Sequence, residues 1–205
     1  SAEERCAATV RAFEAIVHQF VWLLQDKRWV SRHAAGVDQR AFAAQLYKSP
    51  VTAVYDRKVL ARMLVEVARA DGSINDDEVA LLRDFLTDDV GTVEELLAKA
   101  KLSAIELSET TVESRDTLLM LTWAMALTDE NVDIAEEERL ADMAGGLKIT
   151  PERSRELKKW SQLHILDGAL DVNEGEAKLI GYRIGLSDEE VERATIQFQK
   201  RAARA

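Results

Sequence analysis

The sequence has little of the residue types that mark several protein classes. It contains one cysteine, two prolines and nine glycines, and aromatic residues make up 6% of its 205 positions. The single cysteine, Cys6, excludes an intramolecular disulfide framework and a cysteine-rich zinc site, and it favours a cytoplasmic location. Because helix breakers are few and no stretch alternates β-branched with polar residues, we expect an all-α protein.

Long hydrophobic runs, basic surfaces and catalytic motifs are also missing. The run "FEAIVHQFVWLL" at residues 13–24 is interrupted by polar residues and is too short to cross a bilayer, so no membrane insertion is expected. A formal net charge of −10 and a sequence pI near 4.9 make nucleic acid a poor partner. The chain has no phosphate loop, no G-x-S-x-G and no Glu-x-x-His pair, so no enzyme activity is expected.

What the sequence does contain is one acidic pattern in three copies, which we call the first, second and third joints. They read "DGSINDDE" at 71–78, "DENVDIAE" at 129–136 and "DGALDVNE" at 167–174, with the shared template D-x-x-[ILV]-[ND]-x-x-E. The first joint begins like a calcium-binding EF-hand loop, but Leu82 stands where such a loop needs a bidentate glutamate. Apolar helical segments flank each copy, so each joint is predicted to connect the two helices of a hairpin.

The hairpins are predicted to be spaced like a helical repeat. The second and third copies end alike, with "GLKITPER" at 146–153 against "GLSDEEVER" at 185–193. This similarity gives a period of about 38 residues, which lies in the range of helical repeats. The step from the first to the second joint is longer, because "TVEELLAKA" at 92–100 adds a helix with its own capping signal, Thr92 with Glu95.

Helix capping explains most of the template. Asn75, Asp133 and Asp171 are good N-caps, and the glutamate three residues after each completes a capping box. Gly72 and Gly168 can end the preceding helices in the left-handed conformation. Capping does not explain the leading aspartate of each joint, because a carboxylate at the C-terminal end of a helix faces the negative end of the macrodipole. Some positive group should compensate for that position.

The joints also concentrate the negative charge of the chain. Residues 71–78, 129–138 and 167–176 carry four, six and four carboxylates and no Lys or Arg, so these 28 residues hold −14 against −10 for the whole chain. A bound cation explains such focused charge, and oxygen-only ligands favour calcium or magnesium over zinc. A second interpretation stays open, in which the joints are metal-free caps and the acidic surface of a helical scaffold docks a basic protein partner.

The stretches "VARADGSINDDEVALL" and "MALTDENVDIAEEERLADMAGGLKIT" resemble the TerB-like family of tellurite-resistance and stress-response proteins over residues 56–152. The resemblance implies a non-enzymatic helical module that binds a divalent cation and works with protein partners. The family's acidic residues correspond to Asp71, Glu78, Asp129 and Glu136. Two features depart from the family pattern: Glu130 replaces the glycine of the second joint, and the third joint lies beyond the usual two-joint core.

The sequence therefore predicts one bundle of nine or ten helices in three parts: an N-terminal extension (1–55), a TerB-like core (56–152) and a third hairpin (153–205). The predicted metal ligands are Asp71, Glu78, Asp129, Asp133 and Glu136. The third joint offers a possible further set, Asp167, Asp171 and Glu174. We expect the third joint to be structural, because it has fewer carboxylates than the second and follows a less apolar helix. His164, one helical turn before the third joint, is a weaker candidate ligand.

Overall fold

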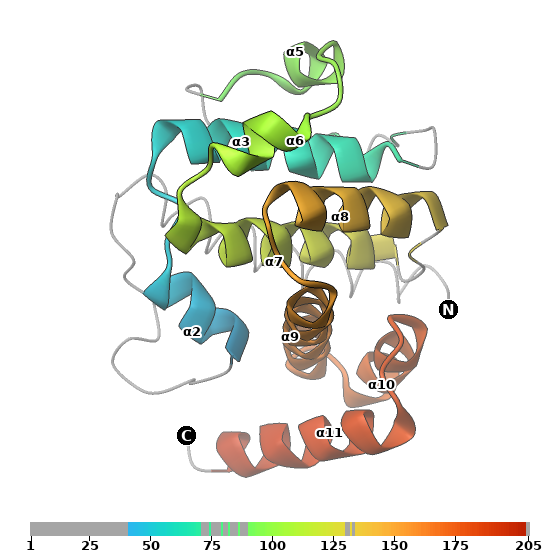
Figure 1. Cartoon of the computed structure of the whole chain (residues 1–205). Coiled ribbons are helices and arrows are strands. Elements are labelled where there is room, and N and C mark those ends of the chain that lie inside the picture. Colours follow the sequence, from blue (N-terminus) through green and yellow to red (C-terminus); the bar gives the residue numbers. More distant parts are fainter. Residues whose placement is uncertain are drawn as a thin grey trace.

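The computed structural model of the chain describes residues 41–70, 90–129 and 134–203, together with the single positions 74, 79, 82, 86 and 132 (Figure 1). Within these residues the regular structure consists of nine α-helices and two 3-10 helices, and no strand is present, which confirms the all-α prediction. The α-helices are α2 (Ala41–Lys48), α3 (Val54–Ala68), α5 (Val93–Leu97), α6 (Ala104–Ser108), α7 (Arg115–Ala126), α8 (Ile134–Gly146), α9 (Pro151–Leu170), α10 (Glu174–Arg183) and α11 (Asp188–Ala202). The 3-10 helices are η1 (Val112–Ser114) and η2 (Leu127–Asp129).

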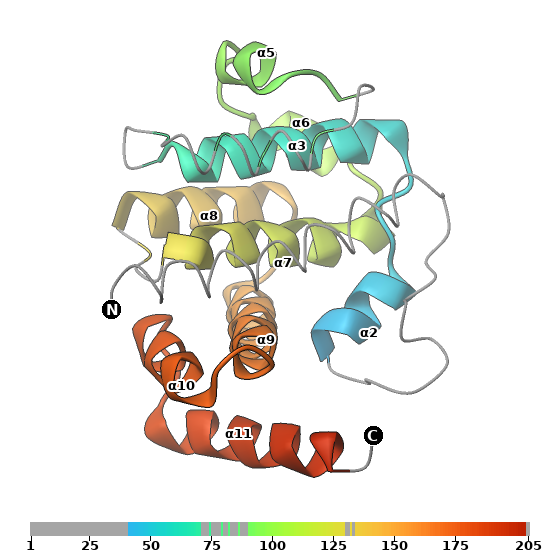
Figure 2. The same cartoon turned by 180° about the vertical axis from the view of Figure 1, so that it is seen from behind.

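Helix α7 is the centre of the bundle. It packs against α3, α8 and α9, and every residue from Thr117 to Ala126 is buried, as expected for a helix that is apolar on all sides. Helices α3, α7 and α8 lie lengthwise beside one another, while α9 runs across them and is seen end-on (Figures 1 and 2). Helices α10 and α11 lie on the far side of α9, so α9 connects the core to the third hairpin.

Several helices begin at the capping residues that the sequence provides. Thr92 starts α5 with a complete capping box, in which its hydroxyl accepts from the amide of Glu95 and the Glu95 carboxylate accepts from the amide of Thr92. This confirms the predicted cap. Equivalent boxes at Ser103 and Ser187 start α6 and α11.

The segment between α5 and η1 is fastened to α3 by side chains that bind its backbone. Arg69 donates to the carbonyl of Leu97 (2.8 Å), and Arg62 donates to the carbonyl of Ala100 (2.8 Å). At the start of α3, the buried carboxylate of Asp56 accepts from the Thr111 amide (3.1 Å) and from the Ser114 hydroxyl (2.7 Å). The segment from Leu97 to Ser114 is therefore held against α3.

The similar ends of α8 and α10 have a shared backbone conformation. Lys148 (φ 62°) and Gly185 (φ 88°) both adopt the left-handed conformation. In each case the next amide bonds back to the helix, Ile149 to the Ala144 carbonyl and Leu186 to the Gly181 carbonyl, which is a Schellman motif. Lys148 therefore corresponds to Gly185, whereas the sequence alignment had paired Gly146 with Gly185.

The N-terminal prediction is only partly covered by the structure. Residues 1–40 of the expected extension lie outside the described residues, and "AFAAQLYK" near its end forms α2. Trp123 is buried and Trp160 is partly buried. No helix in the described part of the chain is both long enough and apolar enough to span a membrane.

Candidate cation site at the acidic joints

The structure describes one complete side chain of the five predicted metal ligands. Glu136 lies in the first turn of α8 and is buried, with 7% of its surface exposed. Asp129 is the last residue of η2, and its side chain lies outside the described part. Asp71, Glu78 and Asp133 also lie outside the described residues. Among the residues that are described, no group of three or more His, Cys, Asp or Glu side chains could hold a metal ion.

The helix ends that flank the first two joints lie at the same end of the bundle. In both views, the C-terminal end of α3 lies close to η2 and to the first turn of α8 (Figures 1 and 2). The first joint follows α3, and the second joint connects η2 to α8. Both joints therefore begin at this end of the bundle.

A buried ion pair joins α3 to α8 near these helix ends. Arg139 of α8 donates to Oε2 of Glu66 in α3 through Nε (3.0 Å) and through Nη2. The other carboxylate oxygen of Glu66 accepts from the Leu102 amide (2.7 Å), and Arg139 Nη2 donates to the Leu102 carbonyl (3.2 Å). Both charged side chains are about nine-tenths buried. The network therefore joins α3, α8 and the segment between α5 and α6 at one point.

This network was missed by the sequence analysis, although one signal was present. Glu66 is a charged residue inside the apolar segment "VLARMLVEVARA", and Arg139 follows Glu136 by one helical turn. A charged residue in a run that is otherwise buried needs a partner, because an unpaired buried charge is unfavourable by several kcal/mol. The partner lies 73 residues away, and no local pattern identifies it.

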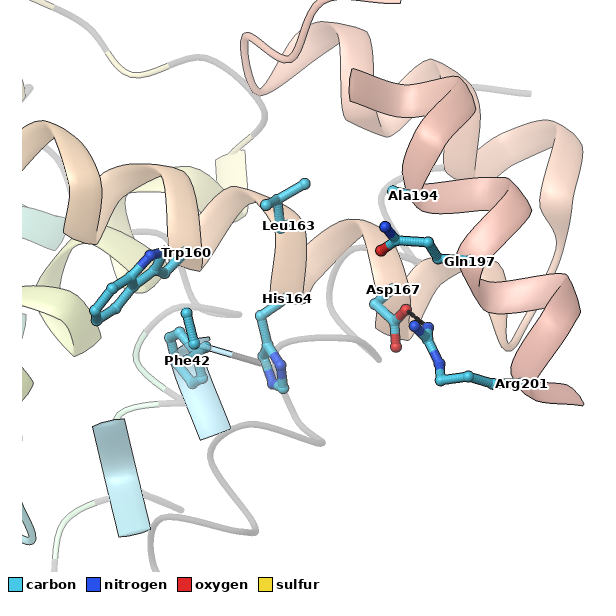
Figure 3. Close-up of a pocket in the computed structure, with 9 residues that line it drawn as sticks. Phe42, Trp160, Leu163, His164, Asp167, Ala194, Gln197 and Arg201 are labelled. Atoms are coloured by element: carbon cyan, nitrogen blue, oxygen red, sulfur yellow. Dashed lines mark hydrogen bonds and ion pairs between the residues drawn. The ribbon is translucent and has the colours of Figure 1, made fainter. Parts of the chain in front are cut away.

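The third joint has protein partners for two of its three candidate ligands. Asp167 at the end of α9 forms an ion pair with Arg201 of α11 (Figure 3). Glu174 forms an ion pair with Lys178 (2.9 Å) and accepts from the Gln199 amide (2.9 Å), and these hydrogen bonds, that of Lys178 first, lower the pKa of Glu174. Asp171 is exposed. In this joint a guanidinium supplies the positive charge that the leading aspartate was expected to need.

The predicted cap of the third joint is wrong by two residues. Helix α9 continues through Gly168 to Leu170, and Asp171 is its C-cap. The N-cap of α10 is Asn173, whose side chain accepts from the amide of Glu176 (3.1 Å). Ala169 and Leu170 are buried, so packing of the last turn extends α9 past the point where Gly168 was predicted to end it.

His164 lies on the same face of α9 as Asp167, as the spacing predicted, and both line one pocket. Its ring stacks on Phe42 of α2, with centroids 4.2 Å apart and ring planes 7° from parallel. The histidine therefore serves as part of an aromatic wall between α2 and α9.

Comparison with known proteins gives one result for this chain. Neither a curated protein nor a solved structure matches it. The family described as tellurite resistance protein TerB matches residues 56–159, which begins two residues into α3 and ends within α9. This match spans the first two acidic joints, the segment between them and the Glu66–Arg139 pair. Because it covers just over half of the sequence, the chain belongs to the TerB family.

Proposed function

We propose that this chain is a non-enzymatic TerB-family module of the cytoplasm that binds calcium or magnesium through the first two joints. The expected ligands are the carboxylates of Asp71, Glu78, Asp129, Asp133 and Glu136. The module would serve a protein assembly, in a stress response such as tellurite resistance. The proposal rests on the family membership of residues 56–159 and on the chemistry of the joints, whose candidate ligands are all oxygen atoms.

The observation that carries the proposal is the Glu66–Arg139 ion pair between α3 and α8. Glu66 precedes the first joint by five residues, and Arg139 follows Glu136 by three. Their ion pair holds the helix ends that flank the two acidic joints close together, with the Glu136 carboxylate buried beside them. The guanidinium of Arg139 is already engaged by Glu66 and by the carbonyl of Leu102.

When bound, a divalent ion would neutralise carboxylates that otherwise repel one another and would link the two hairpins. A ligand that binds only the folded state stabilises it by mass action, by roughly 2.7 kcal/mol at one hundred times the dissociation constant. We therefore expect the melting temperature of the wild type to rise with calcium or magnesium and to fall on addition of chelator.

Thermal melts of three proteins test this assignment. The double variant Asp71→Asn with Asp129→Asn should lose the ion response, because both leading carboxylates are removed while size and polarity are kept. The matched control Asp167→Asn should keep the response, because Asp167 is paired with Arg201. A response that survives the double variant and disappears in Asp167→Asn would transfer the site to the third joint.

The third joint favours a second candidate function. There, the positive charge beside the leading aspartate comes from an arginine of the same chain. The first two joints could receive arginines of a basic protein partner in the same way, which makes the chain a metal-free scaffold. In that case an arginine-rich peptide should bind the wild type with a salt-dependent affinity, and calcium should change neither the melting temperature nor the peptide affinity.

A further inference from the structure

A cavity beside the third joint lies between α2, α9 and α11 (Figure 3). It has a volume of about 110 Å³. Its lining residues are Ala41, Phe42, Trp160, Leu163, His164, Asp167, Ala194, Gln197 and Arg201. Each of them lies outside residues 56–159, the part of the chain that matches the TerB family. The cavity is therefore a feature of this chain beyond the matched region, and it is independent of the cation site.

The walls of the cavity suit one planar ring. Phe42 is buried and stacks on His164, which gives a flat aromatic surface, and the partly buried Trp160 and Leu163 extend the apolar lining. Planar rings prefer to stack or meet edge to face with such surfaces. In another protein, an apolar cavity of about 150 Å³ holds benzene. A cavity of 110 Å³ that is open at its rim beside the exposed Gln197 has room for one ring and not for two.

The other end of the cavity is polar but has no net charge. The carboxylate of Asp167 is paired with the guanidinium of Arg201, and the amide of Gln197 comes from the same face of α11 (Figure 3). A charged ligand would leave one charge without a partner in a partly desolvated place, which is unfavourable. A neutral ligand avoids that penalty. Because an acceptor and a donor lie side by side, the complementary group has an N–H and a C=O on one edge, as a carboxamide does.

We propose that this cavity binds a small neutral molecule made of one planar ring with a carboxamide-type edge. The ring lies against the Phe42–His164 wall, and the amide edge faces the Asp167–Arg201 pair. Recognition depends on the cancellation of the two charges, so a variant that removes one of them changes the preferred charge of the ligand.

Benzamide is the probe that tests the proposal, at pH 8, where an ordinary histidine is neutral. In a ¹H–¹⁵N spectrum, the indole N–H of Trp160 should shift saturably with benzamide. The indole of Trp123, which donates to Ser154 (3.2 Å) outside the cavity, should not shift. Toluene, which has the ring without the polar edge, should bind at least tenfold more weakly. Equal binding of toluene, or no saturable shift of Trp160, would overturn the assigned ligand class.

Variants of α11 locate the site and test the charge argument. Ala194→Leu fills the cavity and should abolish the shift, whereas Ala202→Leu, an exposed position of the same helix, should leave it unchanged. Arg201→Met leaves the Asp167 charge and should make benzylamine bind at least tenfold better than benzamide. Asp167→Asn leaves the arginine and should favour benzoate in the same way. If Ala194→Leu does not fold, these two rim variants decide, and an unchanged preference for benzamide in both contradicts the proposal.

Discussion

Glu66 and Arg139 form a buried ion pair whose carboxylate also accepts a hydrogen bond from the Leu102 amide. Each charged group has its partner, and the carboxylate uses both oxygens. Burying two charges costs about as much as their attraction returns, so the pair as a whole adds little stability. What it does supply is geometry, because the planar guanidinium fixes both the distance and the rotation of α8 against α3.

Removal of one partner should therefore lower the free energy of unfolding much more than removal of both. We expect Arg139→Met to lower the free energy of unfolding by about 3–5 kcal/mol, because the Glu66 carboxylate is left buried without its cation. The double variant Glu66→Leu with Arg139→Met should recover part of that loss, although the Leu102 amide then lacks its acceptor. Urea unfolding of the wild type, both single variants and the double variant measures the coupling.

An exposed pair on α11 provides the control. Arg193 and Glu189 are four residues apart, with side chains 65% and 80% exposed. Because such a pair contributes about 0.3–0.5 kcal/mol, Arg193→Met should have a small effect. If Arg139→Met were no more damaging than Arg193→Met, the buried pair would have no special role in the core.

Two adjacent glycines at the end of α8 should respond in opposite ways to alanine. A Cβ at Gly146 would lie 2.5 Å from Cδ1 and 2.9 Å from Cβ of Leu107, so Gly146→Ala should destabilise the protein by about 1–3 kcal/mol. A Cβ at Gly145 meets nothing within 4 Å. Gly145→Ala should therefore stabilise the protein by about 0.5–1 kcal/mol, because alanine lowers the conformational entropy of the unfolded chain. Denaturant midpoints of the two variants give the comparison, and effects of the same sign would contradict the packing of α6 on α8.

The sequence predicted those features that local signals specify. The helical composition, the hairpins around the second and third joints and the capping box at Thr92 all follow from residues within one or two turns of each other. The predicted N-cap of the third joint was wrong because local signals do not decide it: "DVNEGE" offers both Asp171 and Asn173 as N-caps. The choice between them depends on how far α9 packs before it ends, and that is a property of the core.

Partners that are distant in sequence could not be predicted. The leading aspartate of the third joint needed a positive group, and the chain has 27 Lys and Arg residues that could provide it. The structure selects Arg201, 34 residues away, because α11 packs against α9. The same limit applied to Glu66 and Arg139, whose contact depends on the packing of two separate hairpins.

Lys148 should be a site where glycine improves stability. Its φ of 62° places a side chain in the left-handed conformation, which glycine adopts without strain. We expect Lys148→Gly to raise the free energy of unfolding by about 0.5–1 kcal/mol. The control Lys58→Gly, at an exposed position inside α3, should lower it by about 1 kcal/mol, because glycine is unfavourable within a helix. A loss of stability in both variants would show that contacts of the Lys148 side chain stabilise the protein by more than its left-handed backbone conformation destabilises it.

Glu106 should make the protein sensitive to acid. Its carboxylate accepts from the amide and the hydroxyl of Ser103 (both 2.9 Å) and from Arg62 (2.5 Å). The hydrogen bond from the Ser103 backbone, and next that from Arg62, lower the pKa of Glu106 from 4.5 to about 2. Because the pKa in the folded state lies below that in the unfolded state, the stabilisation is complete above pH 4.5 and is lost as the pH falls toward 2.

The variant Glu106→Gln separates this carboxylate from the other acidic groups. At pH 7 it should be less stable than the wild type by about 0.2–1 kcal/mol, the range of a solvent-exposed ion pair, since the Glu106 side chain is 37% exposed. The difference in melting temperature between the two proteins should shrink as the pH falls from 4.5 to 2, because only the wild type loses a charge at this position. Melting curves at half-unit pH intervals measure that difference. A difference that stays constant over this range would mean that Glu106 is not ionised in contact with Ser103 and Arg62 in the folded protein.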